Sequence, residues 1–200
     1  MQIFRYGVDE INHLRKKDKK LGRAIDEIGM IRRKVTPDIF IALISSVASQ
    51  QISAKAAETV WNRMEERFHE ITPDVIASAA VDDIQMCGMS IRKSGYIKGI
   101  GQVVMEGKLD LAGLIELSDE EVIAHLTELK GVGIWTAELI LIFSMERPDV
   151  VSHGDLAIQR GMMKLYGKPA LSRETFERYR KRYSPFGSVA SLYLWEISHR

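Results

Sequence analysis

The sequence predicts an all-α protein, and three observations support this fold class. Apolar residues recur at helical spacing along most of the chain, as Leu14, Leu21 and Ile25 do near its start. Alternating runs of β-branched residues bounded by turns, which are typical of strands, are nearly absent. Capping residues, prolines and glycines punctuate the helical stretches. We therefore expect a helical protein without a sheet.

The helices follow one another along the chain with short connections. The first helical segment ends at Gly29, a typical C-cap, and Thr36-Pro37-Asp38 opens the next helix. Residues 39–49 are apolar almost all round, which predicts a helix buried at the centre of a bundle. Further helices are expected at 53–68, 73–79, 81–86, 91–106, 111–115, 119–129, 136–143, 173–183 and 187–198.

Composition limits the class of protein. The chain has 200 residues and is 46% hydrophobic, enough to form one compact domain spanning 1–200. Its longest apolar stretches, 39–48 and 139–143, are too short to span a bilayer, so we expect a soluble intracellular protein with no membrane partner. Cys87 is the only cysteine, which excludes an internal disulfide and a four-cysteine zinc or iron–sulfur site. We expect no cofactor.

The charge is nearly balanced, because the formal net charge is only +1. Domains that bind nucleic acid commonly carry a larger basic excess. Basic residues do gather locally, and for any single cluster a solvated helix face is the favoured interpretation over a nucleic-acid surface. The clusters are Lys16, Lys17, Lys19, Lys20 and Arg23; Arg32, Arg33 and Lys34; and Arg173, Arg178, Arg180, Lys181 and Arg182.

The most informative motif is a glycine hairpin between two helices, at residues 129–137. Ser118 followed by Glu121 forms a capping signature for the helix that leads into it. Gly131 and Gly133 let the backbone turn tightly and leave amide N–H groups facing outward. Such amides, at the positive end of the next helix, can hold a phosphate without any base sequence. The segment from about 119 to 143 therefore predicts a helix-hairpin-helix that binds the DNA backbone.

A single carboxylate, Asp155, follows this motif after one helix and a return link. It comes after Gly154 and before the apolar run 156–158, which places it at or beside the start of a helix. Backbone N–H groups and the helix dipole there stabilise the charged form of the side chain. A simple helix cap explains Asp155 taken alone. Its nearness to the hairpin favours a carboxylate that faces developing positive charge.

Taken in order, these motifs resemble the helix-hairpin-helix (HhH-GPD) DNA glycosylase superfamily, in particular its 3-methyladenine DNA glycosylase II branch. The matching segments are 49–53, 129–137 and 154–158, with a weaker match at 184–188 leading to 193–195. The resemblance implies a two-lobed fold with a cleft between the lobes that takes one base. Lobe one would comprise about 1–35 plus 131–200, and lobe two about 36–130.

The resemblance also implies roles for single residues. Asp155 would be the catalytic carboxylate, and Gln51 would fill the gap left by a flipped base, although an ordinary exposed turn explains Gln51 equally well. Trp135 and Trp195 would stack on the base, and core packing is the competing interpretation for both. The full set is Lys130, Gly131, Val132, Gly133 and Thr136 on the DNA backbone, and Trp135, Leu139 and Trp195 in the base pocket. No metal is expected on side chains, while relatives sometimes hold a monovalent cation at the hairpin carbonyls.

The implied reaction is hydrolysis of an N-glycosidic bond in duplex DNA that contains damaged bases. A fixed carboxylate near C1′ stabilises an oxocarbenium-like sugar, and a cationic alkylated purine leaves without a general acid. Bifunctional relatives have a nucleophilic lysine where this chain has Trp135, so no lyase activity is expected. Leu139 stands where the bacterial enzyme has a tyrosine, which predicts a less aromatic base pocket.

The sequence therefore predicts a monofunctional glycosylase that removes alkylated purines, chiefly 3-methyladenine, in base excision repair. We expect a monomer, in the nucleoid or cytoplasm of a prokaryote or the nucleus of a eukaryote. The same fold acting on hypoxanthine, ethenoadenine or uracil is the nearest alternative. A DNA-binding module without activity is another, and it predicts no base release. The intact aspartate argues against a degenerate paralogue that binds lesions without cutting.

Overall fold

The protein is all-α, as predicted. The computed structural model describes residues 2–200, and every regular element among them is a helix. The one β-type contact in these residues is an isolated antiparallel bridge between Ile3 and Lys34. No helix within the described range is both long and apolar enough to cross a bilayer. The expected absence of a sheet is thus confirmed for this part of the chain.

The chain divides into two compact units. The first unit combines the residues up to Val35 with Leu141–Arg200, and the second unit is Thr36–Ile140. The glycine hairpin therefore belongs to the second unit, and Asp155 belongs to the first.

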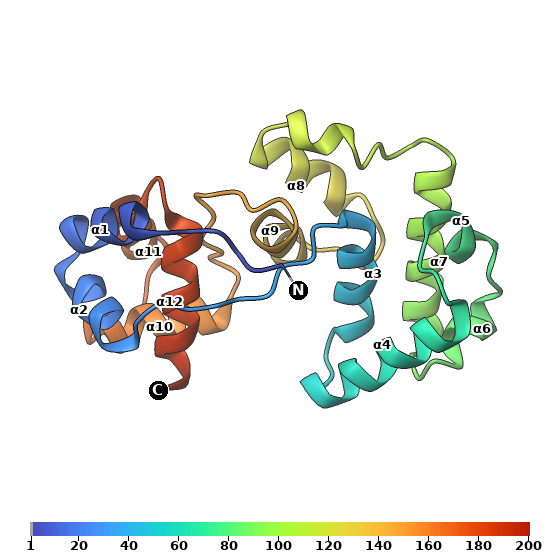
Figure 1. Cartoon of the computed structure of the whole chain (residues 1–200), viewed down its shortest axis with the longest axis horizontal. Helices are drawn as coiled ribbons and strands as arrows, with labels where there is room; N and C mark the ends of the chain where they lie inside the picture. The colour runs from blue at the N-terminus through green and yellow to red at the C-terminus, as the bar shows by residue number, and fades with distance from the viewer. Residues whose placement is uncertain (1) are drawn as a thin grey trace. The chain divides into compact units, whose positions relative to one another are not determined.

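The first unit joins the two ends of the chain, as the blue and red helices of Figure 1 show. Its most extensive helix pair is α10 with α12, which pack at Gly161. A Cβ atom on Gly161 would lie 2.1 Å from the carbonyl oxygen of Leu194, so only glycine lets the helices approach this closely. Its helices are α1 (Val8–Lys17), α2 (Lys19–Ile28), α10 (Leu156–Tyr166), α11 (Arg173–Tyr183) and α12 (Gly187–His199).

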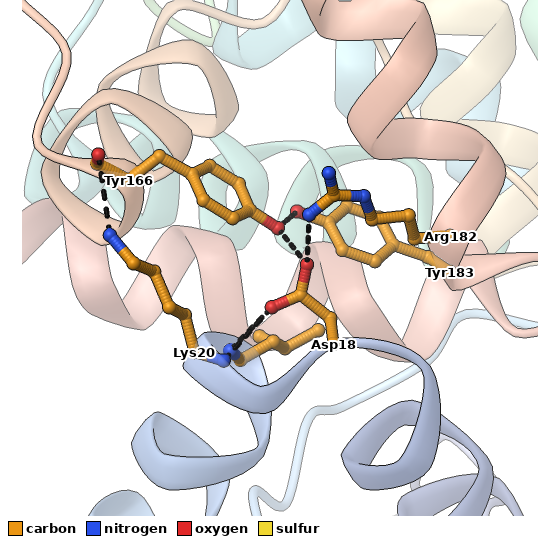
Figure 2. Close-up of polar contacts among 6 residues, drawn as sticks. Asp18, Lys20, Tyr166, Arg182 and Tyr183 are labelled. Carbon is orange, nitrogen blue, oxygen red and sulfur yellow. Dashed lines mark hydrogen bonds and ion pairs between the residues drawn. The ribbon is translucent and has the colours of Figure 1, made fainter.

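The first helical segment is two helices rather than one, because Asp18 interrupts it. The Asp18 side chain accepts hydrogen bonds from the backbone N–H groups of Lys20 and Leu21 and so begins α2. Its other oxygen accepts from the Tyr166 hydroxyl at 2.6 Å and from Arg182 at 3.2 Å, as Figure 2 shows. The cluster, in which Asp18 and Tyr166 are buried and Arg182 is exposed, ties α2 to α10 and α11.

The second unit is built around α3, which is the buried central helix that the sequence predicts. Leu43, Ile44 and Val47 are fully buried, and α3 packs against α4 and α7. The expected helix at 111–115 is instead a short 3₁₀ turn. The elements are α3 (Ile39–Ser49), α4 (Ala54–Phe68), α5 (Pro73–Ser78), α6 (Val81–Gln85), α7 (Ile91–Met105), η1 (Gly113–Glu116), α8 (Asp119–Thr127) and α9 (Ile134–Phe143).

Candidate functional site

The glycine hairpin connects α8 to α9 in the second unit. The predicted capping box begins α8: the Ser118 hydroxyl accepts from the Glu121 N–H at 3.3 Å, and the Glu121 carboxylate accepts from the Ser118 N–H at 2.8 Å. The turn closes with a hydrogen bond of 3.1 Å from the Val132 N–H to the Leu129 carbonyl. Lys130, the predicted backbone contact before the turn, is exposed.

The two hairpin glycines are there for different physical reasons. Gly131 has a φ of +90°, and a Cβ atom on it would lie 2.5 Å from the ring of Tyr96, so the fold itself requires glycine. Gly133 is exposed, and a Cβ atom on it would meet no atom within 4 Å. Glycine at 133 leaves the approach to the first turn of α9 open. The first N–H groups of a helix have no acceptor inside the helix, so this end suits an anion.

Two side chains hold the loop that follows α3. The Gln50 amide donates 2.8 Å to the carbonyl of Gly131, which links the loop to the hairpin. The Lys93 ammonium of α7 donates 3.0 Å to the carbonyl of Ala48 and also donates to the carbonyl of Gln50. Burial lowers the pKa of Lys93. The next residue, Gln51, is exposed and has a φ of +59°, an uncommon conformation for a side-chain-bearing residue.

A pocket of about 530 Å³ in the second unit brings several predicted residues together. Its volume falls in the range of sites that take small organic groups. Trp135 is 44% exposed there, whereas Thr136 is buried. The lining residues are Ser46, Ser49, Gln50, Gln51, Ile52, Gly133, Trp135, Thr136 and Leu139.

Asp155 begins α10 in the first unit, as the sequence predicts. One carboxylate oxygen accepts from the backbone N–H groups of Ala157 at 2.8 Å and Ile158 at 3.0 Å. The other accepts from the indole N–H of Trp195 at 3.0 Å. Asp155 is 7% exposed, while Gly154 is exposed and Leu156 is 69% exposed. The carboxylate therefore lies just beneath the surface in a fixed orientation.

Trp195 has a position that neither sequence interpretation included. Its ring stacks on Phe143, with centroids 5.5 Å apart and planes at 28°, while its N–H binds Asp155. The guanidinium of Arg33 lies 5.8 Å from the centroid of the Phe143 ring, in a cation–π contact. Trp195 is half-buried, and its hydrogen bond holds the Asp155 carboxylate in place. Stacking of Trp195 on a flipped base stays a prediction.

The extended link before Asp155 is fastened to the start of α12. The Val150 N–H donates 3.0 Å to the Ser188 hydroxyl, and the Ser191 hydroxyl donates 2.9 Å to the Val150 carbonyl. The Gly187 N–H donates 3.0 Å to the carboxylate of Asp149. Because α12 also carries Trp195, one helix positions both the link that leads to Asp155 and the indole that binds it.

Residues 2–200 contain no group of three or more His, Cys, Asp or Glu side chains arranged to hold a metal ion. The hairpin carbonyls of Leu129 and Gly131 each accept a hydrogen bond. A carbonyl oxygen has two lone pairs and keeps capacity for a further contact. A monovalent cation at the hairpin carbonyls therefore stays a prediction.

Comparison with known proteins identifies the family. The family model described as "HhH-GPD superfamily base excision DNA repair protein" matches residues 44–185. The chain belongs to the HhH-GPD superfamily. The matched span contains Gln51, the hairpin and Asp155, whereas Trp195 and the start of α12 lie beyond it.

Similar proteins carry a common name. DNA-3-methyladenine glycosylase 1 of Schizosaccharomyces pombe is 35% identical over 161 residues, which cover 78% of this chain and 71% of that relative. A crystal structure of a DNA-3-methyladenine glycosidase from Bacillus halodurans has a TM-score of 0.87 at 33% identity and covers 99% of this chain and 93% of its own. The S. pombe enzyme in complex with abasic DNA has a TM-score of 0.84 at 30% identity, with 96% and 98% covered. The HhH-GPD fold predicted from sequence is confirmed.

Proposed function

We propose that this HhH-GPD protein is a DNA glycosylase that removes alkylated purines of the 3-methyladenine type from duplex DNA in base excision repair. The geometry of Asp155 carries the proposal. A carboxylate held by two backbone N–H groups and an indole N–H is oriented before any substrate arrives. The names of the S. pombe and B. halodurans relatives support the substrate class.

Asp155 supplies the chemistry in this proposal. Breaking the N-glycosidic bond leaves positive charge on the sugar, and a fixed carboxylate stabilises that charge without reorganising. The same carboxylate orients the water that attacks C1′. An alkylated purine is already cationic and leaves as a neutral base, so no general acid is required. The abasic site that remains is the chemical state of the DNA in the S. pombe complex.

The hairpin holds the DNA backbone. The opening beside Gly133 and the first turn of α9 present N–H groups to a phosphate, and Lys130 adds a positive charge nearby. Backbone amides contact phosphate in the same way whatever the base sequence is. This suits an enzyme that must bind any stretch of DNA.

Gln51 fills the space that the flipped nucleotide leaves in the duplex, and the pocket beside it receives the base. Gln51 is exposed and is kept at positive φ by a loop fixed through Gln50 and Lys93. Strained residues of this kind persist where the surroundings hold them, often at functional sites. We assign Gln51 as the residue that fills the space left by the base. Trp135 and Leu139 are the apolar part of the pocket for the base.

The same proposal includes an absence of lyase activity. Lyase activity requires a nucleophilic amine that forms a Schiff base with the sugar. The indole of Trp135 is not such an amine. The product should therefore be an intact strand with an abasic site. Gel analysis before and after alkaline treatment tests this, because a bifunctional enzyme nicks the strand without alkali.

The decisive experiment measures release of free base from methylated duplex DNA by the wild type and by Asp155→Asn. Asparagine is also a good N-cap, so α10 is expected to keep its start. The wild type should release 3-methyladenine, and the variant should be at least about 10²-fold slower, the usual loss for a preorganised electrostatic group. Equal release by both proteins would end the catalytic proposal. Duplexes containing hypoxanthine, ethenoadenine or uracil distinguish the other lesions, and release from none of them favours a binding module.

A further inference from the structure

The segment after Asp155 is basic along its whole length. From Leu156 to Arg173 it contains four cations and no acidic residue, in a chain with a net charge of only +1. Arg160 and Lys164 are four residues apart on α10, and Lys168 continues the same spacing just past its end. All three side chains are exposed. We call Arg160, Lys164 and Lys168 the α10 basic face.

The α10 basic face surrounds a surface hollow. The three cations line a depression of about 470 Å³ together with Met163, Gly167 and Pro169. Like charges four residues apart on a helix repel each other by a few tenths of a kcal/mol. Within the described residues, none of the three forms a salt bridge. Arg160 donates to the Leu156 carbonyl at 3.2 Å, and Lys164 donates to the Ser198 carbonyl at 2.8 Å.

We propose that the α10 basic face binds the phosphate backbone of the DNA on which Asp155 acts, as a second backbone contact independent of the hairpin. This rests on the proposed function, because it uses Asp155 as the residue at the reacting sugar. The eleven residues of α10 extend about 16 Å from Asp155. Duplex DNA carries a negative charge for about every 1.7 Å of its axis, so phosphates flank any nucleotide within that distance.

The basic residues of α1 and α2 differ from this face and provide a control. Lys16, Lys17 and Arg23 are equally exposed, but the same two helices also carry exposed acidic residues, among them Asp26 and Glu27 of α2. Arg15 of the same segment forms a salt bridge with Asp26. Mixed charges of this kind are typical of a solvated surface.

The test is the salt dependence of binding to undamaged duplex DNA, followed by fluorescence anisotropy. The variant is Arg160→Gln with Lys164→Gln and Lys168→Gln, and the control is Lys16→Gln with Lys17→Gln and Arg23→Gln, which removes the same charge. Each lost phosphate contact lowers the slope of log K against log salt by about 0.9, so the variant should lose about 2 to 3 in slope. The control should lose less than about 1. An unchanged slope, or equal losses in both proteins, would overturn the proposal.

A second variant protects the test against misfolding. Lys168→Glu lies beyond the end of α10 and reverses one charge without touching the helix. It should lower the slope by about 1, and full retention of the slope would count against the α10 basic face. Undamaged DNA needs no catalysis, so these measurements stay decisive even if the wild type releases no base. Loss of the proposed function and loss of this surface are thus separate results.

Discussion

The hairpin and the carboxylate site contrast in how they are built. At the hairpin, Gly133 is exposed and Ile134 is 62% exposed, and the groups on offer belong to the backbone. At the carboxylate, Asp155 is 7% exposed, and a side chain is fixed by three N–H donors. In the function we propose, the hairpin accepts any DNA sequence because it uses atoms that every residue has. The carboxylate faces one carbon atom and is therefore a single side chain held in place.

The largest effect is expected on stability, where the two hairpin glycines should behave differently. Gly131→Ala forces a side chain to positive φ and against Tyr96, at a cost of about 1 to 3 kcal/mol from the backbone alone. Its thermal midpoint should fall by at least about 2 °C, because a kcal/mol corresponds to about 2 to 4 °C at this chain length. Gly133→Ala should melt like the wild type. If the two variants have equal thermal midpoints, the fold does not require glycine at 131 more than at 133.

The next effect concerns the donor to the carboxylate. Trp195→Phe removes the indole N–H but keeps a ring against Phe143. Leaving a buried carboxylate oxygen without this donor costs about 1 to 3 kcal/mol, so base release should slow by about 5-fold to 150-fold. Trp61→Phe is the matched control, since its N–H donates to Glu65 on α4. If both variants release base at the same rate, Trp195 does not position Asp155.

A smaller effect is expected at the loop that carries Gln51. Lys93→Met removes the ammonium that donates to the carbonyls of Ala48 and Gln50, so the loop loses its anchor to α7. We expect about a threefold to tenfold loss of affinity for DNA containing an abasic site, or about 1 kcal/mol. Lys98→Met is the control, because Lys98 of the same helix donates to the carbonyl of Ala79. If Lys93→Met and Lys98→Met bind this DNA with equal affinity, Lys93 has no role in DNA binding.

The smallest effect concerns the stability of the helices that support Asp155, and it appears only at alkaline pH. Burial raises the pKa values of Tyr166, Tyr183 and Tyr193, three of the six tyrosines. A pKa raised on folding contributes stability below the unfolded value of about 10, and that stability is lost as the pH rises above it. In an alkaline absorbance titration, three tyrosines should ionise only as the chain unfolds. Simultaneous ionisation of all six near pH 10 would contradict the burial of these three tyrosines, two of which, Tyr166 and Tyr183, belong to the cluster of Figure 2.

Local signals in the sequence predicted much of the fold. The helix at 173–183 has the predicted bounds, and the Ser118 capping box begins α8 as expected. The break between α1 and α2 was missed, because Asp18 owes its position to Tyr166 and Arg182, which are distant in sequence. Asp18 is a possible helix cap, but the apolar spacing continues past it, so the sequence alone does not predict that the helix is interrupted there.

The same limit applies to the site. The Gly154-Asp155 pattern was enough to place Asp155 at a helix start, because capping is a local interaction. The bond between Trp195 and Asp155 joins residues 40 apart, and the bond between Gln50 and Gly131 joins residues 81 apart. No spacing rule connects such pairs. Lys93 was missed for the same reason, since an isolated lysine on a helix is ordinarily solvent-exposed.

A comparison of two variants in two assays tests most directly whether the hairpin supplies DNA affinity and the carboxylate supplies the chemistry. The wild type, Asp155→Asn and Gly133→Val are each measured for affinity to undamaged duplex and for base release from methylated duplex at saturating enzyme. We predict that Gly133→Val weakens affinity at least about tenfold, since one or two charge-assisted contacts are worth about 1.5 to 3 kcal/mol each. Asp155→Asn should bind like the wild type and release almost no base. If Asp155→Asn releases base at the wild-type rate, the carboxylate does not carry the chemistry and the account is wrong.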